Sequence, residues 1–131
     1  METPTRQFSG INSSPEFEKD FKKLSRKFLS LEEDLKIFKN TALRAFHHFG
    51  QENLGIFQIP GLGFDYPKVY KATKFACKSL KGRGAVTGIR AVYAYYLDKD
   101  EILLIEIYFK ADRKNEDRAR IAACIEKHKK S

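Results

Sequence analysis

The sequence has no long apolar segment, few cysteines and no secretory pattern at its start. No apolar run approaches the ~20 residues that a helix needs to cross a bilayer, which argues against a membrane-spanning protein. The first five residues, Met1–Thr5, contain neither a basic region nor an apolar region. We therefore expect no secretory signal and a cytoplasmic location. The two cysteines, Cys77 and Cys124, form no C-x-x-C pair and are expected to stay reduced.

Motifs for metal ions and nucleotide cofactors are missing as well. There is no H-E-x-x-H sequence, and His47 and His48 are neighbours on a predicted helix and therefore point apart. The pair Gly61-x-Gly63 does not continue as a dinucleotide-binding fingerprint and is expected to be a plain loop. We therefore expect no metal and no small-molecule cofactor.

Acidic residues are absent from one central stretch, Lys68 to Arg90, which is rich in cations. Its positive residues are Lys68, Lys71, Lys74, Lys78, Lys81, Arg83 and Arg90. The whole chain of 131 residues carries a formal charge of +8 and has a sequence pI of about 9.5. A surface of one sign favours a polyanionic partner, and nucleic acid is the first candidate, ahead of an acidic protein or an anionic membrane.

The N-terminal half predicts two amphipathic helices. Ser14 can cap a helix whose first position is Pro15, and the apolar stripe that follows is Phe17, Phe21, Leu24 and Phe28. Ser30 and Glu33 have the form of a capping box, and Gly50 is a natural stop. The second stripe is Leu35, Phe38, Ala42, Phe46 and Phe49. A link of two or three residues predicts an antiparallel helical hairpin.

The C-terminal half predicts strands and a last helix. After a possible first strand at 6–11 and a connector at 51–67, which includes a short extended piece at 56–59, strands are expected at 69–77, 87–97 and 102–110. In the last strand, alternation puts Leu103, Ile105, Ile107 and Phe109 on one face and Glu106, Tyr108 and Lys110 on the other. We expect the hairpin to cover the apolar face and the polar face to stay open. A helix at 115–130 follows, with Ile121, Ala122 and Ile125 as its apolar side.

The predicted fold class is therefore α+β: one domain, 1–131, in which an N-terminal helical hairpin packs on one face of a small, mainly antiparallel sheet, with a C-terminal helix and a flexible start at 1–5. The segments Y-K-x-x-K-F-x-C-K-S-L-K-G-R-G, G-I-R-A-V-Y and I-E-I-Y-F-K-A-D resemble the RelE/ParE superfamily of toxins from type II toxin–antitoxin systems, closest to the RelE and HigB branch. The resemblance runs from Phe8 to the C-terminal helix, in the order β-α-α-β-β-β-α.

The resemblance implies a ribosome-dependent endoribonuclease that cuts messenger RNA by attack of the ribose 2′-oxygen on the adjacent phosphorus, without metal. It also implies a cognate antitoxin as partner, besides messenger RNA and the ribosome. The catalytic positions that it suggests are Arg90, Lys110, Lys74, Lys71 and Tyr108. The positions that it suggests for RNA binding are Lys78, Lys81, Arg83 and Arg113.

Some roles remain open in the sequence. Many relatives have Lys-x-Arg where this chain has Lys71-x-Thr73, so either Lys71 or its substitute Lys74 is expected to be the general base. Glu106 either orients Arg90 and Lys110 or acts as an alternative base.

Tyr93 is expected in the core, and at most one of Tyr95 and Tyr96 is expected to meet RNA. A non-enzymatic toxin of the same fold, such as a ParE-like inhibitor of DNA gyrase, and a plain RNA-binding domain are the alternatives. The basic constellation around Arg90 and Lys110 favours the nuclease.

Overall fold

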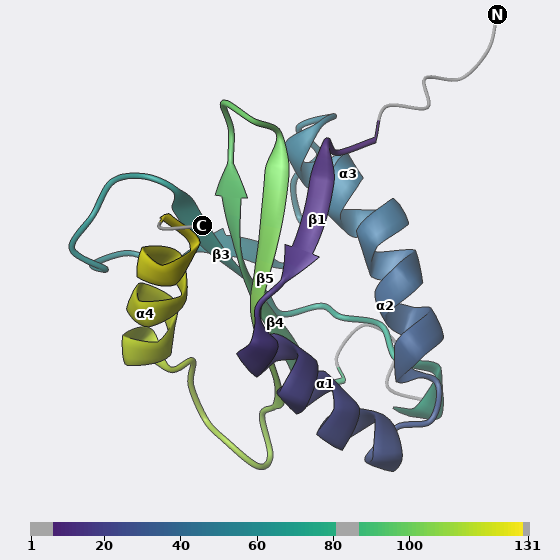
Figure 1. Ribbon diagram of the computed structural model, residues 1–131. Coiled ribbons are helices and arrows are strands. Elements are labelled where there is room, and N and C mark those ends of the chain that lie inside the picture. Colours follow the sequence, from purple (N-terminus) through teal and green to yellow (C-terminus); the bar gives the residue numbers. More distant parts are fainter. Residues whose placement is uncertain (1–6, 81–86, 130–131) are drawn as a thin grey trace, which may run out of the picture.

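The computed structural model describes residues 7–80 and 87–129, and these form one five-stranded sheet with helices on both faces (Figure 1). In chain order the elements are β1 (Gly10–Ser13), α1 (Pro15–Lys27), α2 (Leu31–Asn40), α3 (Ala42–His47), β2 (Ile56–Gln58), β3 (Lys68–Ala72), the 3₁₀ helix η1 (Lys78–Leu80), β4 (Ile89–Tyr96), β5 (Glu101–Phe109) and α4 (Arg118–Lys129). No helix in this described part is long and apolar enough to cross a membrane.

The strands lie in the order β1-β5-β4-β3-β2. β1 runs parallel to β5, and all other neighbours are antiparallel. The α+β class, the N-terminal helices on one face and the C-terminal helix are thus confirmed. The first strand lies at Gly10–Ser13, later than the predicted 6–11, and the predicted extended piece at 56–59 is the edge strand β2.

Helix α1 begins as the sequence predicts. The N–H of Phe17 donates to the Ser14 hydroxyl over 3.0 Å, and Pro15 occupies the first helical position, where its missing N–H leaves no bond unmade. Phe17 is 1% exposed, at the centre of the contact between α1 and β5. The helix is amphipathic because its other face carries the lysines.

The second predicted helix is divided at Thr41 into α2 and α3. Thr41 has φ −117° and ψ −75°, and its hydroxyl donates back to the Ile37 carbonyl over 2.6 Å, a local bond that competes with a straight helix. The predicted capping box of Ser30 and Glu33 does not form. The Ser30 hydroxyl donates to Asp34 and accepts the N–H of Ser79, so it joins α2 to the segment before β4 rather than closing its own helix end.

A β-bulge between Val92 and Tyr93 changes which residues of β5 meet the helices. Ile107 and Phe109 face α1 and α2, as predicted, but Leu103 and Ile105 face the other way, toward α4. Their expected packing against the helical hairpin is therefore wrong, and Leu104 takes that place.

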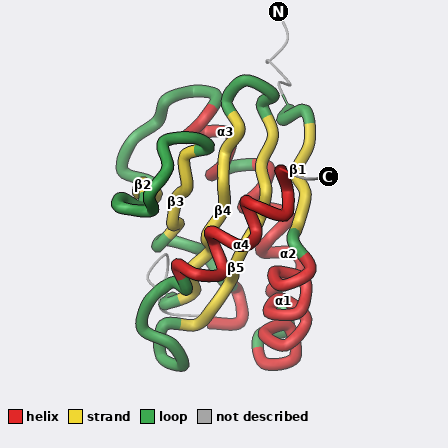
Figure 2. The backbone as a smooth tube through the Cα atoms, turned by 60° about the vertical axis from the view of Figure 1, so that its left-hand side comes forward, coloured by secondary structure: helices red, strands yellow, loops and turns green. Residues whose placement is uncertain are grey.

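The second face of the sheet is consequently not an open polar surface. Helix α4 lies across β4 and β5 on this face (Figure 2) and buries Ile121, Cys124 and Ile125 there. The predicted Ala122 is exposed instead, because the contact follows the 121–124–125 spacing of one helical face. What remains of this face lies beyond the N-terminal start of α4, next to the C-terminal half of β5.

Candidate nucleic-acid interface

Arg90 and Tyr108 form a cross-strand pair on the second face of the sheet, beyond the helix α4. They are directly opposite in the β4–β5 register, so their side chains lie on the same face. One guanidinium nitrogen of Arg90 donates to the Thr73 carbonyl over 2.7 Å, which fixes the side chain while leaving it partly exposed. Tyr108 is 5% exposed, and among the described residues its buried hydroxyl has no hydrogen-bond partner.

The turn before β4 explains why Arg90 takes this position. Gly88 has φ +87°, a conformation that disfavours other residues, and a Cβ there would lie 3.3 Å from the Phe109 ring. Its carbonyl accepts the N–H of Lys110 over 2.7 Å, so the start of β4 is tied to the end of β5. Lys110 is exposed and directly follows the last residue of β5.

The surroundings of Tyr108 keep its phenol protonated. Burial raises the pKa of Tyr108 to about 12, and the carboxylates of Glu116 and Glu106 act in the same direction. The charges of Arg113 and Arg90 oppose this rise in the pKa without cancelling it. The hydroxyl of Tyr108 can therefore donate a proton or a hydrogen bond at neutral pH, but it is a poor general base.

Glu106 is fully buried and holds the segment that follows β5. It accepts from the Arg113 guanidinium and, over 3.1 Å, from the N–H of Asp117, and Arg120 lies 3.8 Å away. Burial raises the pKa of Glu106 despite these partners. The expectation that Glu106 orients Arg90 and Lys110 is wrong, since it binds Arg113 and the start of α4.

Arg113, predicted to bind RNA, is thus partly engaged within the protein. Its guanidinium carbon lies 4.5 Å from the centre of the Tyr108 ring, and its side chain is 38% exposed. Arg113 covers one side of Tyr108 while presenting part of its charge to solvent.

Lys71, another predicted site residue, also lies on this face. Its ammonium is 2.8 Å from the Glu116 carboxylate, which also lies 3.6 Å from Arg118. Partial burial alone would raise the pKa of Glu116, but the hydrogen bond and charge of Lys71 bring it below its usual value. Lys71 is therefore neutralised by a carboxylate and is not in the cation-crowded environment that the sequence suggested.

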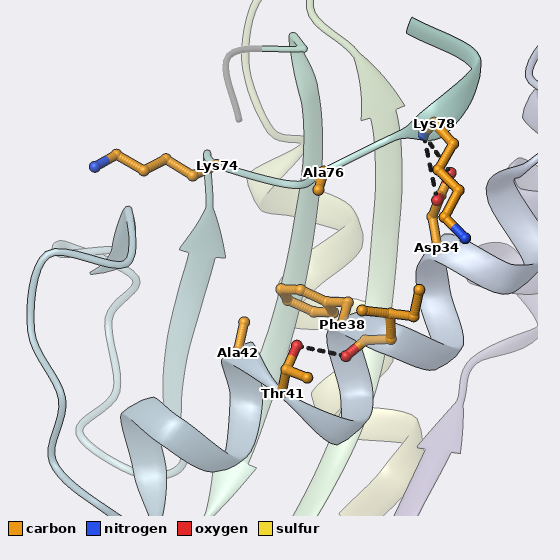
Figure 3. A pocket seen from close by; sticks show the side chains of 8 residues that line it. Asp34, Phe38, Thr41, Ala42, Lys74, Ala76 and Lys78 are labelled. Carbon is orange, nitrogen blue, oxygen red and sulfur yellow. Dashed lines mark hydrogen bonds between the residues drawn. The ribbon is translucent and has the colours of Figure 1, made fainter. Parts of the chain in front are cut away.

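Lys74 and Lys78 lie elsewhere, at a pocket of about 230 Å³ between α2 and the segment that joins β3 to η1 (Figure 3). Lys74 reaches the Asn53 carbonyl over 3.3 Å, and Lys78 pairs with Glu33 over 2.7 Å. The structure does not bring Lys74 to Arg90, so its predicted role as substitute base loses its geometric basis. Lys81 and Arg83 lie outside the described residues.

Sequence reasoning missed Glu116, Phe57 and the role of Thr73. The backbone N–H and hydroxyl of Thr73 both donate to the Gly55 carbonyl, while its own carbonyl holds Arg90. Phe57 is 61% exposed on β2, opposite Lys71 in the register. Only the strand pairing brings these residues to one face, and no local motif signals it.

The tyrosines and histidines are mostly structural. Tyr93 is buried in the core as predicted, and Tyr95 and Tyr96 are each 6% exposed, so neither presents a ring to RNA. His47 shares a hydrogen bond of 2.7 Å with the Tyr93 hydroxyl, and burial lowers the pKa of His47 to about 4. Within residues 7–80 and 87–129, no group of His, Cys, Asp or Glu side chains is arranged to hold a metal ion.

No protein-family model matches the chain, and no curated protein matches its sequence. Among solved structures, the chain is similar to the archaeal RelE–RelB complex from Pyrococcus horikoshii OT3. The two share 12% sequence identity, and the match covers 82% of this chain and 97% of that chain with a TM-score of 0.45.

Proposed function

We propose that this chain is the toxin of a type II toxin–antitoxin pair, and that it cleaves messenger RNA on the ribosome. The observation that carries the proposal is the Arg90–Tyr108 pair: a guanidinium fixed by the Thr73 carbonyl, beside a protonated phenol whose hydroxyl has no partner among the described residues. A fixed cation next to a proton donor suits a reaction that builds negative charge on phosphoryl oxygens.

The reaction is attack of the ribose 2′-oxygen on the adjacent phosphorus, with departure of the 5′-oxygen of the next nucleotide. Arg90 and Lys110 stabilise the charge on the phosphoryl oxygens, and Tyr108 gives a proton or hydrogen bond to the leaving oxygen. The proton of the 2′-hydroxyl goes to the carboxylate of Glu116, which Lys71 holds in its charged form. The products are a 2′,3′-cyclic phosphate and a free 5′-hydroxyl, with no metal taking part.

Access to Tyr108 requires one movement. The Arg113 guanidinium lies over the ring and is shared with Glu106. A substrate phosphate that binds the exposed part of Arg113 competes with Glu106 for this charge and uncovers the hydroxyl. Arg113 therefore binds RNA in the proposal, and Lys78, Lys81 and Arg83 remain its further predicted RNA contacts.

The charge of the chain supports the proposed partners. The formal charge of +8 suits ribosomal and messenger RNA phosphates, and it also suits an acidic antitoxin that covers the same face. The proposed place of action is the cytoplasm, where ribosomes are. Expression without the antitoxin should stop bacterial growth, and growth should return when the neighbouring gene product is supplied.

RNA binding without cleavage is the second candidate. The observation that favours it is that two predicted site cations are paired with carboxylates of the protein, Lys71 with Glu116 and Arg113 with Glu106. Lys71, the predicted general base, is therefore already engaged. This function needs the cationic face but no proton transfer.

Incubation with ribosomes on a defined messenger, followed by analysis of the fragment ends, decides between the two. Cyclic phosphate and 5′-hydroxyl ends are expected, and they should disappear in Arg90→Ala. Arg26→Ala is the matched control because Arg26 is an exposed arginine on α1, on the opposite side of the sheet. Binding to ribosomes without new ends would leave the RNA-binding domain as the function.

A further inference from the structure

Phe57 is an exposed aromatic side chain on the same face of the sheet as Arg90. In the antiparallel β2–β3 pair, Phe57 lies opposite Lys71 and Ile56 opposite Ala72. Ile56 and Ala72 are buried on the face that the N-terminal helices cover, so alternation puts Phe57 on the other face with Lys71. The ring is 61% exposed because helix α4 does not extend to the edge strand.

A single exposed aromatic residue is ordinary, so its neighbours decide what it means. The Lys71–Glu116 ion pair lies beside Phe57, because Lys71 is its partner on the neighbouring strand β3. Arg90, held by the Thr73 carbonyl, lies on the next strand, β4. From strand spacing and rise, the Cα atoms of Phe57 and Arg90 lie ~12 Å apart. One or two nucleotides of an extended single strand span this distance.

We propose that Phe57 is a stacking platform for a base of single-stranded RNA whose phosphate binds at Arg90. The ring offers an apolar surface, and the ammonium of Lys71, directly opposite Phe57 in the register, offers a hydrogen-bond donor to the base edge. This combination of an aromatic face with adjacent cations is how proteins bind single strands. The inference rests on the proposed function, since it assigns the substrate of the same site a second contact.

An acidic protein partner is the competing occupant of this surface. Among the described strands, the short strand β2 pairs with β3 alone, and its other edge is able to accept a strand from another protein. However, such a partner would use the backbone of β2, and it gives no reason for an aromatic ring beside a fixed guanidinium. A nucleotide uses both groups at once, so RNA is the occupant that the arrangement favours.

The experiment uses the absence of tryptophan from this chain. The variant Phe57→Trp carries one indole, whose fluorescence a stacked base quenches. The control is Phe49→Trp, because Phe49 is 56% exposed but follows α3, which packs on the opposite face. The probes are an adenosine decanucleotide at low salt and inorganic polyphosphate, which has the charge but no bases.

The decanucleotide should quench Phe57→Trp and leave Phe49→Trp unchanged, and polyphosphate should quench neither. Phe57→Ala should weaken decanucleotide binding roughly tenfold or more with little effect on polyphosphate, whereas Arg90→Ala should weaken both. The inference would be overturned if the decanucleotide did not quench Phe57→Trp or did not bind the unchanged protein. Equal losses of decanucleotide and polyphosphate binding in Phe57→Ala would overturn it as well. If Phe57→Ala lost binding to an acidic protein partner but kept its binding to RNA, the inference would also be overturned.

The result is separable from the proposed function. Quenching by RNA in a protein that makes no cleavage ends on ribosomes would support the stacking contact and remove the nuclease. Cleavage that depends on Arg90 but is unchanged in Phe57→Ala, without quenching, would keep the nuclease and remove the stacking contact.

Discussion

The ammonium of Lys71 lies 2.8 Å from the carboxylate of Glu116, and the two residues are 45 positions apart in the sequence. The pair joins β3 to the segment before α4 and brings an ionised acid to the face that carries Arg90. A surface that the sequence presents as uniformly cationic therefore contains a carboxylate able to accept a proton.

Replacement of that carboxylate tests its role. If Glu116 accepts the proton of the 2′-hydroxyl, Glu116→Gln should lower the single-turnover cleavage rate on ribosomes about 100-fold or more, with ribosome affinity nearly unchanged. Because the hydrogen bond and charge of Lys71 outweigh partial burial and hold the pKa of Glu116 below its usual value, protonation of Glu116 should not lower the rate of the unchanged enzyme near neutral pH. Glu126→Gln, an exposed carboxylate on α4, is the control. Equal rates in both variants would assign the proton to another group.

Arg90 should act on the transition state more than on binding. Arg90→Ala is expected to lower the single-turnover rate about 100- to 1,000-fold, the usual effect of removing one charged stabiliser, and Lys110→Ala should act similarly. Lys78→Ala should leave the rate nearly unchanged and act on binding alone, because Lys78 lies at the α2 pocket, away from Arg90. If all three variants showed only binding defects, the face would be an RNA-binding surface without catalysis.

Glu106 should matter chiefly for stability. Glu106→Ala leaves the Arg113 guanidinium and the Asp117 N–H without their buried acceptor, and the free energy of unfolding should fall by about 3–5 kcal/mol in urea titrations. Glu106→Gln keeps an acceptor for the Asp117 N–H and should lose less. A stable Glu106→Ala variant would show that the segment before α4 does not depend on this anchor.

Substitutions at Gly88 and Gly50 test the effects of backbone strain and of steric contact separately. Both have positive φ, +87° and +65°, but a Cβ at Gly88 meets the Phe109 ring at 3.3 Å while nothing lies within 4 Å at Gly50. Gly50→Ala should cost ~1–2 kcal/mol from the left-handed backbone alone. Gly88→Ala should cost more and should also lower cleavage, since it displaces the start of β4. Similar unfolding free energies for both variants would contradict the close contact.

His47 should make the protein less stable in mild acid. Burial lowers the pKa of His47 in the folded protein to about 4 from 6.5, with His48 lowering it further and Asp100 opposing. The unfolded chain thus binds more protons between these values, and stability falls as pH decreases from 6.5 toward 4, by up to about 3 kcal/mol. His47→Gln should flatten this part of the stability profile, which unfolding at several pH values measures. An unchanged slope would assign the effect to the carboxylates.

The local elements could be predicted from the amino-acid sequence. Ser14 and Pro15 start α1, the polar turn before Glu101 separates β4 from β5, and the helical stripes select one face of the sheet. These features depend on contacts between residues close along the chain, which a periodic pattern records. The cation-rich segment and the place of Arg90 on a strand were predictable for the same reason.

The division of the second face between α4 and the candidate site could not be predicted in this way, because it depends on long-range packing. The bulge at Val92 reverses the alternation that put Ile105 among the helix-facing residues, and a one-residue shift of this kind leaves no mark in a local pattern. Burial of Glu106 under Arg113 and the position of Phe57 on an edge strand likewise depend on strand register and on the path of the segment before α4. Contacts between distant residues set both, so the composition of the candidate site follows from the packing of the whole sheet.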